Sequence, residues 1–290
     1  MADGDGWRRC ALGHVHWGRH GAAGLMVFHR DPGDGRKRVL LQQRAWWGSG
    51  GGTWGMFSGG MATREDPVAT ALRETAEEST LDTSRVRLYG TWTEDHGGWA
   101  FTTVFGEMDH RPVVEPASRE TRRAEWVPVE EVDRRKLFSP FARSWPTLRG
   151  ALARLVVIVD GANVVGARAD HGWWKDRAGA NARLRDDLAA LAEGVTGLPD
   201  GLVPYEVAYP ETVLVVEGAA RRVADEPRDG VRVVAAPGSG DDLIADLAAH
   251  TDLDTVPLVV TADRELRARC ESAGAAVIGP RWLLERLPRR

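Results

Sequence analysis

The hydrophobic and polar positions follow one pattern in the first half of the chain and another in the second. In the first half, apolar runs of strand length are separated by segments rich in Gly, Asp and Pro, and they cover residues 21–28, 38–45, 101–108 and 125–129. Such runs bounded by turn residues predict β-strands, and the first two predict a hairpin. Residues 67–81 instead repeat apolar side chains at helical spacing after an initial proline, which predicts a helix. Residues 136–150 are less regular and are interpreted as an end piece and linker.

The second half of the chain alternates continuous apolar runs with helical stretches. The apolar runs cover residues 155–159, 212–216, 231–236 and 257–262. Strands without polar alternation are typical of a parallel sheet that helices cover on both faces. The pattern therefore predicts an α/β protein with two domains, residues 1–150 and 151–290, of which the second is a three-layer α/β/α domain with a parallel sheet.

Composition narrows the class of protein. The chain has 290 residues, enough for two domains that each bury a core. No apolar run approaches the roughly 20 residues of a membrane helix, and the first residues lack the apolar stretch of a secretory signal, so we expect a cytoplasmic protein without a membrane partner. The net charge of −4 argues against a surface built throughout to hold nucleic acid. Cys10 and Cys270 fit a reducing compartment, and neither has the spacing expected of a metal site.

A cluster of charged residues stands on the predicted helix and just before it. Reading forward from Gly59, Glu65 follows after five residues, and Arg73, Glu74, Glu77 and Glu78 begin after seven more. Residues three and four apart share a helix face, so Glu74, Glu77 and Glu78 are predicted to converge. Arg73 can pair with Glu77, but one arginine leaves a surplus of carboxylates that suits Mg²⁺ or Mn²⁺. The alternative is a solvated acidic helix face.

Residues 59–81, GGMATREDPVATALRETAEESTL, resemble the Nudix box, whose pattern is G-x5-E-x7-R-E-U-x-E-E-x-G-U with U an aliphatic residue. The resemblance implies a Nudix α/β/α sandwich with a mixed sheet over roughly the first half of the chain. It also implies a set of catalytic and supporting residues, which here are Glu65, Arg73, Glu74, Glu77 and Glu78. In the family, the glutamate after the arginine and the paired glutamates bind Mg²⁺ or Mn²⁺ or serve as the base.

The same resemblance implies a reaction and a substrate class. Nudix enzymes cleave a diphosphate linkage in a nucleoside diphosphate derivative, such as an NTP or dNTP hydrolysed to NMP and pyrophosphate. A more distant glutamate often completes the metal site, and Glu120 is the candidate here. Trp54, Trp92 and Trp99 lie where this fold would place a pocket, and they could stack on a nucleobase or pack in the core.

Three positions depart from the Nudix pattern. Thr75 occupies the aliphatic position and Thr80 the glycine position, and Ser58 stands where many members have a glycine. A helix end commonly requires a left-handed residue that glycine adopts without strain. These departures concern loop geometry and remove no carboxylate. They leave open an alternative from another class, a non-catalytic regulatory protein that senses a nucleotide and binds RNA.

A second group of acidic residues follows the apolar runs of the second half. Asp160 and Asn163 follow the first run, and later runs are followed by Glu217, Asp241, Asp242 and Asp263. Because the carboxyl ends of parallel strands meet at one edge of a sheet, these acids are predicted to form a cation site for phosphodiester hydrolysis. Single acids after strands are also common helix N-caps. A phosphatase of the haloacid dehalogenase type would need an aspartate at Ala162.

Residues 155–290 resemble the PIN-like nucleases, specifically the NYN group. The matching positions are Asp160, Asn163, Asp242 or Asp241, and Asp263. The resemblance implies that these acids bind Mg²⁺ or Mn²⁺ and cleave RNA. Beside them, Trp173, Trp174, Lys175 and Arg177 combine aromatic rings with positive charge, a mixture suited to single-stranded RNA. The alternatives are an amphipathic helix with a tryptophan anchor, and a degenerate module that only binds RNA or a partner.

Overall fold

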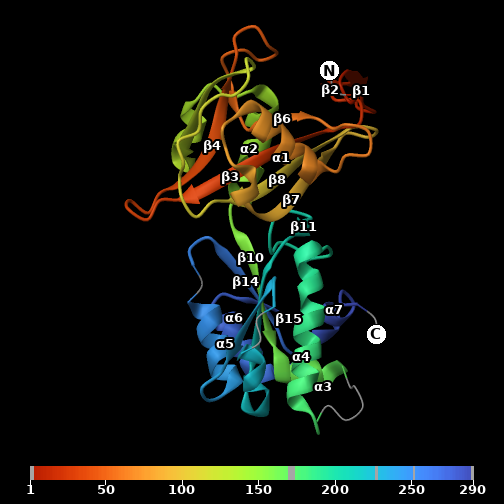
Figure 1. Cartoon of the computed structure of the whole chain (residues 1–290), viewed down its shortest axis with the longest axis vertical. Helices are drawn as coiled ribbons and strands as arrows, with labels where there is room; N and C mark the ends of the chain where they lie inside the picture. The colour runs from red at the N-terminus through yellow and green to blue at the C-terminus, as the bar shows by residue number, and fades with distance from the viewer. Residues whose placement is uncertain (1–2, 169–173, 226–227, 251, 289–290) are drawn as a thin grey trace. The chain divides into compact units, whose positions relative to one another are not determined.

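The computed structural model describes residues 3–168, 174–225, 228–250 and 252–288 (Figure 1). These residues form two compact units: unit 1 contains the chain up to Leu152 together with Pro204–Glu206, and unit 2 contains the rest. The first segment ends two residues after the predicted boundary at residue 150, and residues 204–206 also belong to unit 1, where the ring of Tyr205 packs against that of Tyr89 with centroids 5.9 Å apart. Both units combine helices with a β-sheet, so the predicted α/β class is confirmed.

Unit 1 is built on a mixed β-sheet. Its strands are β3 (Ala22–Arg30), β4 (Lys37–Arg44), β5 (Trp54–Gly55), β6 (Phe57–Gly60), β7 (Arg87–Asp95), β8 (Ala100–Glu107) and β9 (Thr121–Pro128). Along the sheet the order is β7-β8-β3-β4-β5, while β6 also pairs with β3 and β9 with β4. β3 runs parallel to β8 and antiparallel to β4, which confirms the predicted mixed sheet. A separate hairpin joins β1 (Trp7–Arg9) to β2 (Val15–Trp17).

Helix α1 (Pro67–Glu78) packs on β3 of this sheet. It begins after Asp66, whose carboxylate accepts hydrogen bonds from two backbone N–H groups of the first turn. Ala71 is fully buried and shares one core cluster with Leu25 of β3. The helix ends earlier than the predicted residue 81, because Ser79 adopts an extended backbone with φ −145° and ψ 166°.

The sequence pattern did not predict helix α2 (Ser139–Gly150), the long strand β7 or the short strands β1, β2, β5 and β6 of unit 1. Helix α2 occupies the segment interpreted as an end piece and linker, which is a correction. Its two prolines obscure a helical pattern, yet Phe141, Trp145 and Leu148 recur at helical spacing and are all buried. Strand β7 was missed because it carries several polar residues. The shorter 3₁₀ turns are η1 (Thr83–Arg85) and η2 (Val129–Arg134).

Unit 2 is built on a parallel β-sheet. Its strands are β10 (Arg154–Asp160), β12 (Glu211–Val216), β13 (Val231–Ala235), β14 (Thr255–Val260) and β15 (Ala276–Ile278), of which β15 was not predicted. They lie in the order β13-β12-β10-β14-β15, and each of these pairings is parallel, which confirms the predicted sheet type. From β10 the chain adds β12 and β13 on one side of the sheet, and it then adds β14 and β15 on the other side. The direction in which successive strands are added therefore changes between β10 and β14. Open α/β sheets bind ligands at the carboxyl ends of the strands beside such a reversal.

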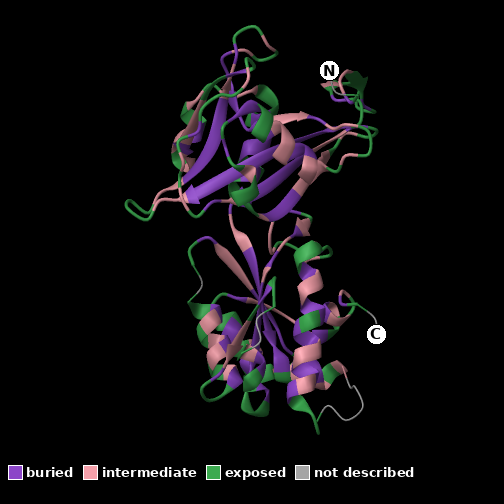
Figure 2. Cartoon of the chain, viewed as in Figure 1, coloured by how far each residue is buried: buried purple, intermediate pink, exposed green. Residues whose placement is uncertain are grey.

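Helices cover both faces of the sheet of unit 2, and Figure 1 shows the resulting three layers. One face carries α3 (Gly161–Arg168), α4 (Arg177–Leu188) and α7 (Pro280–Leu284), and the other carries α5 (Gly240–Ala249) and α6 (Arg264–Ser272). The remaining short elements are β11 (Val207–Ala208), η3 (Ala189–Glu193) and η4 (Gly218–Asp225). Figure 2 shows that the central strands of each unit are largely buried. Among the described residues, no helix has the length and apolar character needed to cross a bilayer.

Candidate functional site

The charged residues of helix α1 lie against strand β6, which precedes it. Gly59 of β6 is held close to the helix, since a Cβ atom at this position would lie 2.0 Å from the Glu74 carboxyl carbon. Any side chain larger than hydrogen would therefore displace Glu74. This close approach gives the first glycine of the predicted pattern a physical role.

Arg73 connects the loop before α1 to the helix. Its guanidinium donates two hydrogen bonds of 2.8 Å to Glu65, one to each carboxylate oxygen. It also donates to Glu74 at 2.8 Å, to Glu77 at 3.3 Å and to the backbone oxygen of Gly60 at 3.2 Å. The hydrogen bonds from Arg73 lower the pKa of Glu65 to about 2. Glu65 thus stays ionised and fixes the arginine beside the other carboxylates.

Glu74 and Glu78 are buried more deeply than Glu77. Burial raises the pKa of Glu74, and it raises the pKa of Glu78 to about 8, with the charges of Glu74 and Glu120 adding to the second shift. Gln42 donates a hydrogen bond of 2.8 Å to Glu78, and the hydroxyl of Thr121 holds the Gln42 side chain at 2.7 Å. Glu77 remains open to solvent, with 59% of its side chain exposed.

The structure therefore brings together the five residues predicted on and before this helix. Glu120 is exposed just before β9, and its charge contributes to the raised pKa of Glu78. That Glu120 completes a metal site with the helix carboxylates stays a prediction. Gln42 was missed by sequence reasoning, because its position in an alternating strand gives no sign that its side chain points at the helix.

The departures from the Nudix pattern are accommodated by the backbone. Thr75 is buried and its hydroxyl donates to the carbonyl oxygen of Ala71 at 2.7 Å, so no hydroxyl is left unsatisfied there. Thr80 needs no left-handed backbone, since the helix ends through an extended Ser79. Among the described non-glycine residues, the one with a positive φ is Arg64, not Thr80. Ser58 pairs with Gly24 of β3 as an ordinary strand residue.

The three tryptophans predicted near the pocket differ in exposure. Trp54 is 5% exposed, and the guanidinium of Arg135 lies 4.7 Å from its ring centroid. Trp99 is also buried, and it stacks on His16. Both rings are therefore engaged in packing, which is the second of the two alternatives that the sequence left open for them. Trp92 of β7 is partly exposed and keeps a free area for contact.

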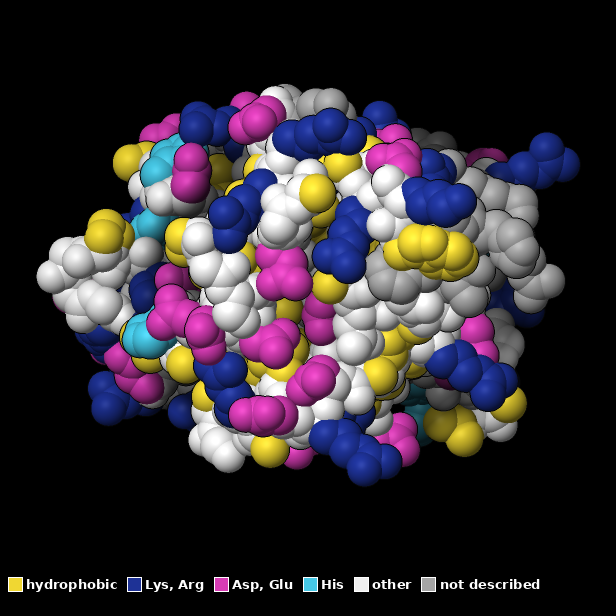
Figure 3. All heavy atoms as spheres, turned by 90° about the horizontal axis from the view of Figure 1, so that it is seen from below, with side chains coloured by type: hydrophobic (Ala, Val, Ile, Leu, Met, Phe, Trp, Pro, Cys, Tyr) yellow, Lys and Arg dark blue, Asp and Glu magenta, His cyan; other side chains and the backbone are white. Residues whose placement is uncertain are grey.

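A cavity of about 280 Å³ lies at the carboxyl ends of the strands of unit 2. Its polar lining consists of Asp160, Asn163, Glu217, Asp241 and Asp263. Figure 3 views the chain from below and shows Asp and Glu side chains gathered near the middle of that face. Acids that follow separate strands thus meet at one place, as the parallel topology requires.

Asp160 is the most buried acid of this cavity, with 6% of its surface exposed. It accepts hydrogen bonds from the backbone of Asn163 at 3.0 Å and from the hydroxyl of Thr261 at 2.8 Å. Burial raises the pKa of Asp160, and the charges of Asp241 and Glu217 act in the same direction. Thr261 was missed by sequence reasoning, although it follows β14 as Asp160 ends β10, and Val159 and Val260 are register partners.

The neighbouring residues Asp241 and Asp242 have different surroundings. Asp241 lines the cavity, and burial raises its pKa, with the charges of Asp263 and Glu217 adding to the effect. Asp242 instead pairs with Arg269 at 2.8 Å and leaves 73% of its side chain exposed. Of the two predicted aspartates, Asp241 lines the cavity and Asp242 does not, which corrects the placement of Asp242 among the residues of this site, because consecutive residues of a helix point in different directions.

The remaining polar positions of unit 2 serve structure as well as the cavity. The side chain of Asn163 accepts a hydrogen bond from the backbone of Ala262 at 2.8 Å. Asp263 caps α6 by accepting from the backbone of Leu266 at 2.8 Å, so the N-cap interpretation holds for it. Trp174 is 58% exposed and Lys175 is exposed before α4, while Trp173 lies outside the described residues.

Comparison with known proteins bears on the first half of the chain. The family model for the NUDIX domain matches residues 18–147. A Bifidobacterium longum protein described as a "Nucleoside triphosphate pyrophosphatase/Nudix hydrolase fusion protein" is 41% identical over 155 residues, which cover 52% of this chain and 32% of that protein. A Mycobacterium tuberculosis protein described as "Putative 8-oxo-dGTP diphosphatase 3" is 40% identical over 157 residues, covering 52% of this chain and 71% of that protein.

Among solved structures, the Nudix hydrolase RenU from M. smegmatis is 36% identical, with a TM-score of 0.47. The match covers 50% of this chain and 93% of that one. The chain thus spans about a third of the length of the B. longum relative and about seven-tenths of that from M. tuberculosis.

Proposed function

The chain belongs to the Nudix family, and from this premise we propose that unit 1 hydrolyses a nucleoside triphosphate or deoxynucleoside triphosphate to the monophosphate and pyrophosphate. The observation that carries the proposal is the arrangement on α1, in which Arg73 holds Glu65, Glu74 and Glu77 within hydrogen-bond distance while Glu78 is buried beside them. The family relation supports the reaction class, and the carboxylates are the groups that can bind a divalent metal and accept a proton.

The donor set fits Mg²⁺ or Mn²⁺. Glu74 is partly buried and Glu78 is buried, and this burial raises the pKa of both carboxyls despite the hydrogen bonds from Arg73 and Gln42. Together with Glu77, and with Glu120 at the edge, they offer the oxygen ligands that hard divalent cations prefer. Such an ion, when bound, neutralises charge on the phosphate oxygens and lowers the pKa of water.

The protein side chains divide the remaining tasks. Glu65 and Arg73 fix the loop at Gly60 against the helix, so the carboxylates are oriented before substrate arrives. Glu77 is the most exposed of the three helix glutamates and can accept the proton of the attacking water. Attack of that water on phosphorus breaks the bond to the bridging oxygen, and the monophosphate and pyrophosphate leave.

The substrate class follows from one relative and from one surface residue. The M. tuberculosis relative is described as a putative 8-oxo-dGTP diphosphatase, and this description points to a deoxynucleoside triphosphate. Trp92 is the predicted tryptophan that keeps partial exposure and can stack on a base. A purine triphosphate, oxidised or not, is therefore the first substrate to test.

The test is release of pyrophosphate and phosphate from a panel of NTPs, dNTPs and oxidised dNTPs with Mg²⁺ or Mn²⁺. Wild type is compared with Glu77→Gln and with Asp160→Asn. We expect turnover that requires metal, is lost in Glu77→Gln and persists in Asp160→Asn. Absence of turnover with the whole panel would contradict the proposal and favour the nucleotide-sensing alternative.

A second candidate activity belongs to unit 2, where we propose metal-dependent cleavage of single-stranded RNA. The proposal rests on Asp160, Asp241 and Asp263 around one cavity at the carboxyl ends of parallel strands. Trp174 and Lys175 are exposed in the same unit and suit a nucleic-acid strand. Incubation of labelled single-stranded RNA with Mn²⁺ should give cleavage that is lost in Asp160→Asn and kept in Glu77→Gln. Binding without cleavage would leave a module that only holds RNA.

A further inference from the structure

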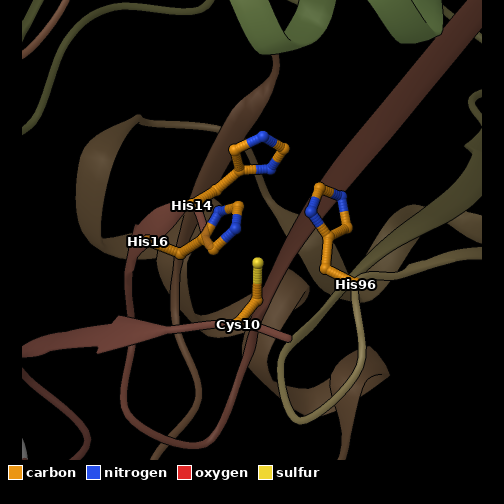
Figure 4. Close-up of side chains that lie close together, drawn as sticks. All are labelled: Cys10, His14, His16 and His96. Carbon is orange, nitrogen blue, oxygen red and sulfur yellow. The ribbon is translucent and has the colours of Figure 1, made fainter. Parts of the chain in front are cut away.

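A group of metal-ligating side chains lies in unit 1 apart from the carboxylates of α1. Cys10, His14, His16 and His96 each offer one ligand atom, and these four atoms all lie within 4.8 Å of one another (Figure 4). We propose that these four residues, hereafter the Cys–His cluster, bind one Zn²⁺ ion in a closed tetrahedral site. The inference concerns a site that the Nudix chemistry does not use.

The backbone brings three of the ligands together in one hairpin. Strands β1 and β2 pair antiparallel, and the connecting turn is closed by hydrogen bonds from Cys10 N to His14 O and from Gly13 N to Cys10 O, both 3.0 Å. His16 lies in β2, directly across from Arg8. This local geometry places the Cys10 thiol and the two imidazoles at the same end of the hairpin (Figure 4).

The fourth ligand comes from the loop between β7 and β8. The backbone N–H of Ala11 donates to Gly97 O at 2.8 Å, which fixes the hairpin turn beside His96. Gly97 has φ +72°, and a Cβ atom there would lie 2.7 Å from the Cβ of Ala11. Glycine is therefore required at this contact, since it allows both the left-handed backbone and the close approach.

Ring packing orients the histidines toward a common point. His16 stacks on Trp99, with centroids 3.8 Å apart and an interplanar angle of 10°, and the Trp99 indole donates to Gly18 O at 2.9 Å. His96 meets His16 edge-on at 4.7 Å. Cys10 is 5% exposed and belongs to the same small apolar cluster as Trp99. The side chains are thus held in place before a metal arrives.

Two ring nitrogens of the cluster lack a protein partner. His16 Nε2 and His96 Nδ1 are buried, and neither has a hydrogen-bond partner among the described residues. Buried polar atoms are nearly always satisfied, so two such nitrogens close together require an explanation. A metal ion would accept a lone pair from each of these nitrogens and so take the place of the missing hydrogen bonds.

The ligand types select zinc. One thiolate and three imidazoles are soft or borderline donors that suit Zn²⁺, whereas Mg²⁺ and Mn²⁺ prefer oxygen. Zinc bond lengths imply distances of about 3.3–3.6 Å between the ligand atoms of a tetrahedral site with one sulfur and three nitrogens, so the cluster needs only small side-chain adjustments to close. Four protein ligands leave no open position, which is typical of structural sites.

The position of the cluster indicates what the ion would stabilise. The hairpin continues to Gly18, and Arg19 N donates to Gly4 O at 2.9 Å. Asp3 in turn accepts a hydrogen bond of 2.9 Å from the backbone of Thr63, in the loop that carries Glu65. A zinc ion in the cluster would therefore fix the N-terminal hairpin that supports this loop.

The proposed site differs from the sequence expectation for Cys10, which found no metal-site spacing around this residue. Cys10, His14 and His16 form a Cys-x3-His-x-His pattern, which differs from the common zinc-finger spacings. His96 lies far along the chain, and only the fold brings it to the other three. The local part of the signal could have been found in the sequence, but the complete site could not.

The test measures zinc binding by the full chain. Protein stripped with a chelator is titrated with Zn²⁺, and separately with Co²⁺, in excess Mg²⁺ that occupies the carboxylates. We expect one tightly bound zinc per chain by elemental analysis. Bound Co²⁺ should show the intense visible bands of tetrahedral coordination and a thiolate charge-transfer band that is lost in Cys10→Ser.

Variants assign the zinc to the cluster. His14→Ala and His96→Ala should each weaken binding at least about 100-fold, while His110→Ala, at a partly exposed histidine outside the cluster, should leave it unchanged. His14 is exposed, so its removal leaves the core intact, and equal thermal unfolding of metal-free His14→Ala and wild type verifies folding. Absence of a tight site in wild type, its persistence in both histidine variants, or its loss in Glu77→Gln would overturn the proposal.

Discussion

The two units each gather several carboxylates, but they do so by different means. In unit 1 the acids lie on one helix and its preceding loop, and Arg73 contacts three of them directly. In unit 2 the acids follow separate strands, and among the described residues that line the cavity there is no lysine or arginine. The first cluster is organised by helix periodicity and an arginine, the second by sheet topology.

This difference explains how each cluster manages repulsion between like charges. Arg73 compensates part of the charge in unit 1, while burial, with a smaller contribution from neighbouring carboxylates, still raises the pKa of Glu74 and Glu78. In unit 2, neutral donors take the place of an arginine, since the Thr261 hydroxyl and the backbone N–H of Asn163 satisfy Asp160. Unit 1 should therefore respond mainly to changes of charge, and unit 2 to changes of hydrogen bonding.

The largest expected effect is on catalysis by unit 1. Glu78→Gln keeps the size of the side chain and its contact with Gln42 but removes a buried carboxylate that we propose as a metal ligand. We expect the kcat for triphosphate hydrolysis to fall on the order of 10³-fold. Steady-state kinetics at saturating Mg²⁺ measure the effect.

Asp160→Asn is the matched control, because it removes a buried acid from the other cluster. Its triphosphate hydrolysis should equal that of wild type. An equal loss of triphosphate hydrolysis in both variants would show that the two carboxylate clusters do not act separately.

The second effect is on the stability of the metal-free protein. The pKa of Glu78 is about 8 in the folded chain and about 4.3 in an unfolded one. The folded chain therefore favours the protonated form of Glu78, and proton binding by Glu78 contributes to the free energy of unfolding. This contribution is complete below the unfolded pKa and is lost as pH rises through 8. Between pH 5 and pH 8, Glu78→Gln should gain on the order of 3 kcal/mol relative to wild type.

Denaturant unfolding in the presence of a chelator measures this difference at each pH. A gap between the two proteins that stays constant from pH 5 to pH 8 would show that the Glu78 carboxyl titrates normally. Ionisation of Glu78 in the folded chain would then cost less free energy than the burial of this residue indicates.

The two clusters also differ in how far the sequence could predict them. Helix spacing was sufficient to place Glu74, Glu77 and Glu78 beside Arg73, because all four lie within two helical turns. For unit 2, the apolar runs predicted the sheet, yet Thr261 and the choice of Asp241 over Asp242 depend on strand order and on the phase of α5. Contacts within a helix are encoded locally, whereas contacts between strands require the fold.

The third effect concerns hydrogen bonding in unit 2. Thr261→Val keeps the shape of the side chain but removes the hydroxyl that donates to Asp160 and accepts from the backbone of Asp263. We expect a loss of about 1–3 kcal/mol in the free energy of unfolding, since a buried carboxylate loses a partner. Thr212→Val is the matched control: this threonine is also buried in the sheet, and its hydroxyl has no hydrogen-bond partner among the described residues. Equal losses in the two variants would argue against a special role for Thr261.

The smallest effects come from the adjacent residues Asp241 and Asp242. Asp241→Asn should stabilise the metal-free protein at neutral pH, because burial and the charges of Asp263 and Glu217 oppose ionisation of Asp241. Asp242→Asn should instead destabilise it by about 0.5 kcal/mol, the magnitude of an exposed salt bridge such as that with Arg269. Thermal unfolding of the two variants in a chelator separates these directions. Stability changes of opposite sign in the two variants would show that repulsion between carboxylates is confined to the cavity that Asp241 lines. Changes of the same sign would show that Asp241 and Asp242 belong to one solvated acidic surface.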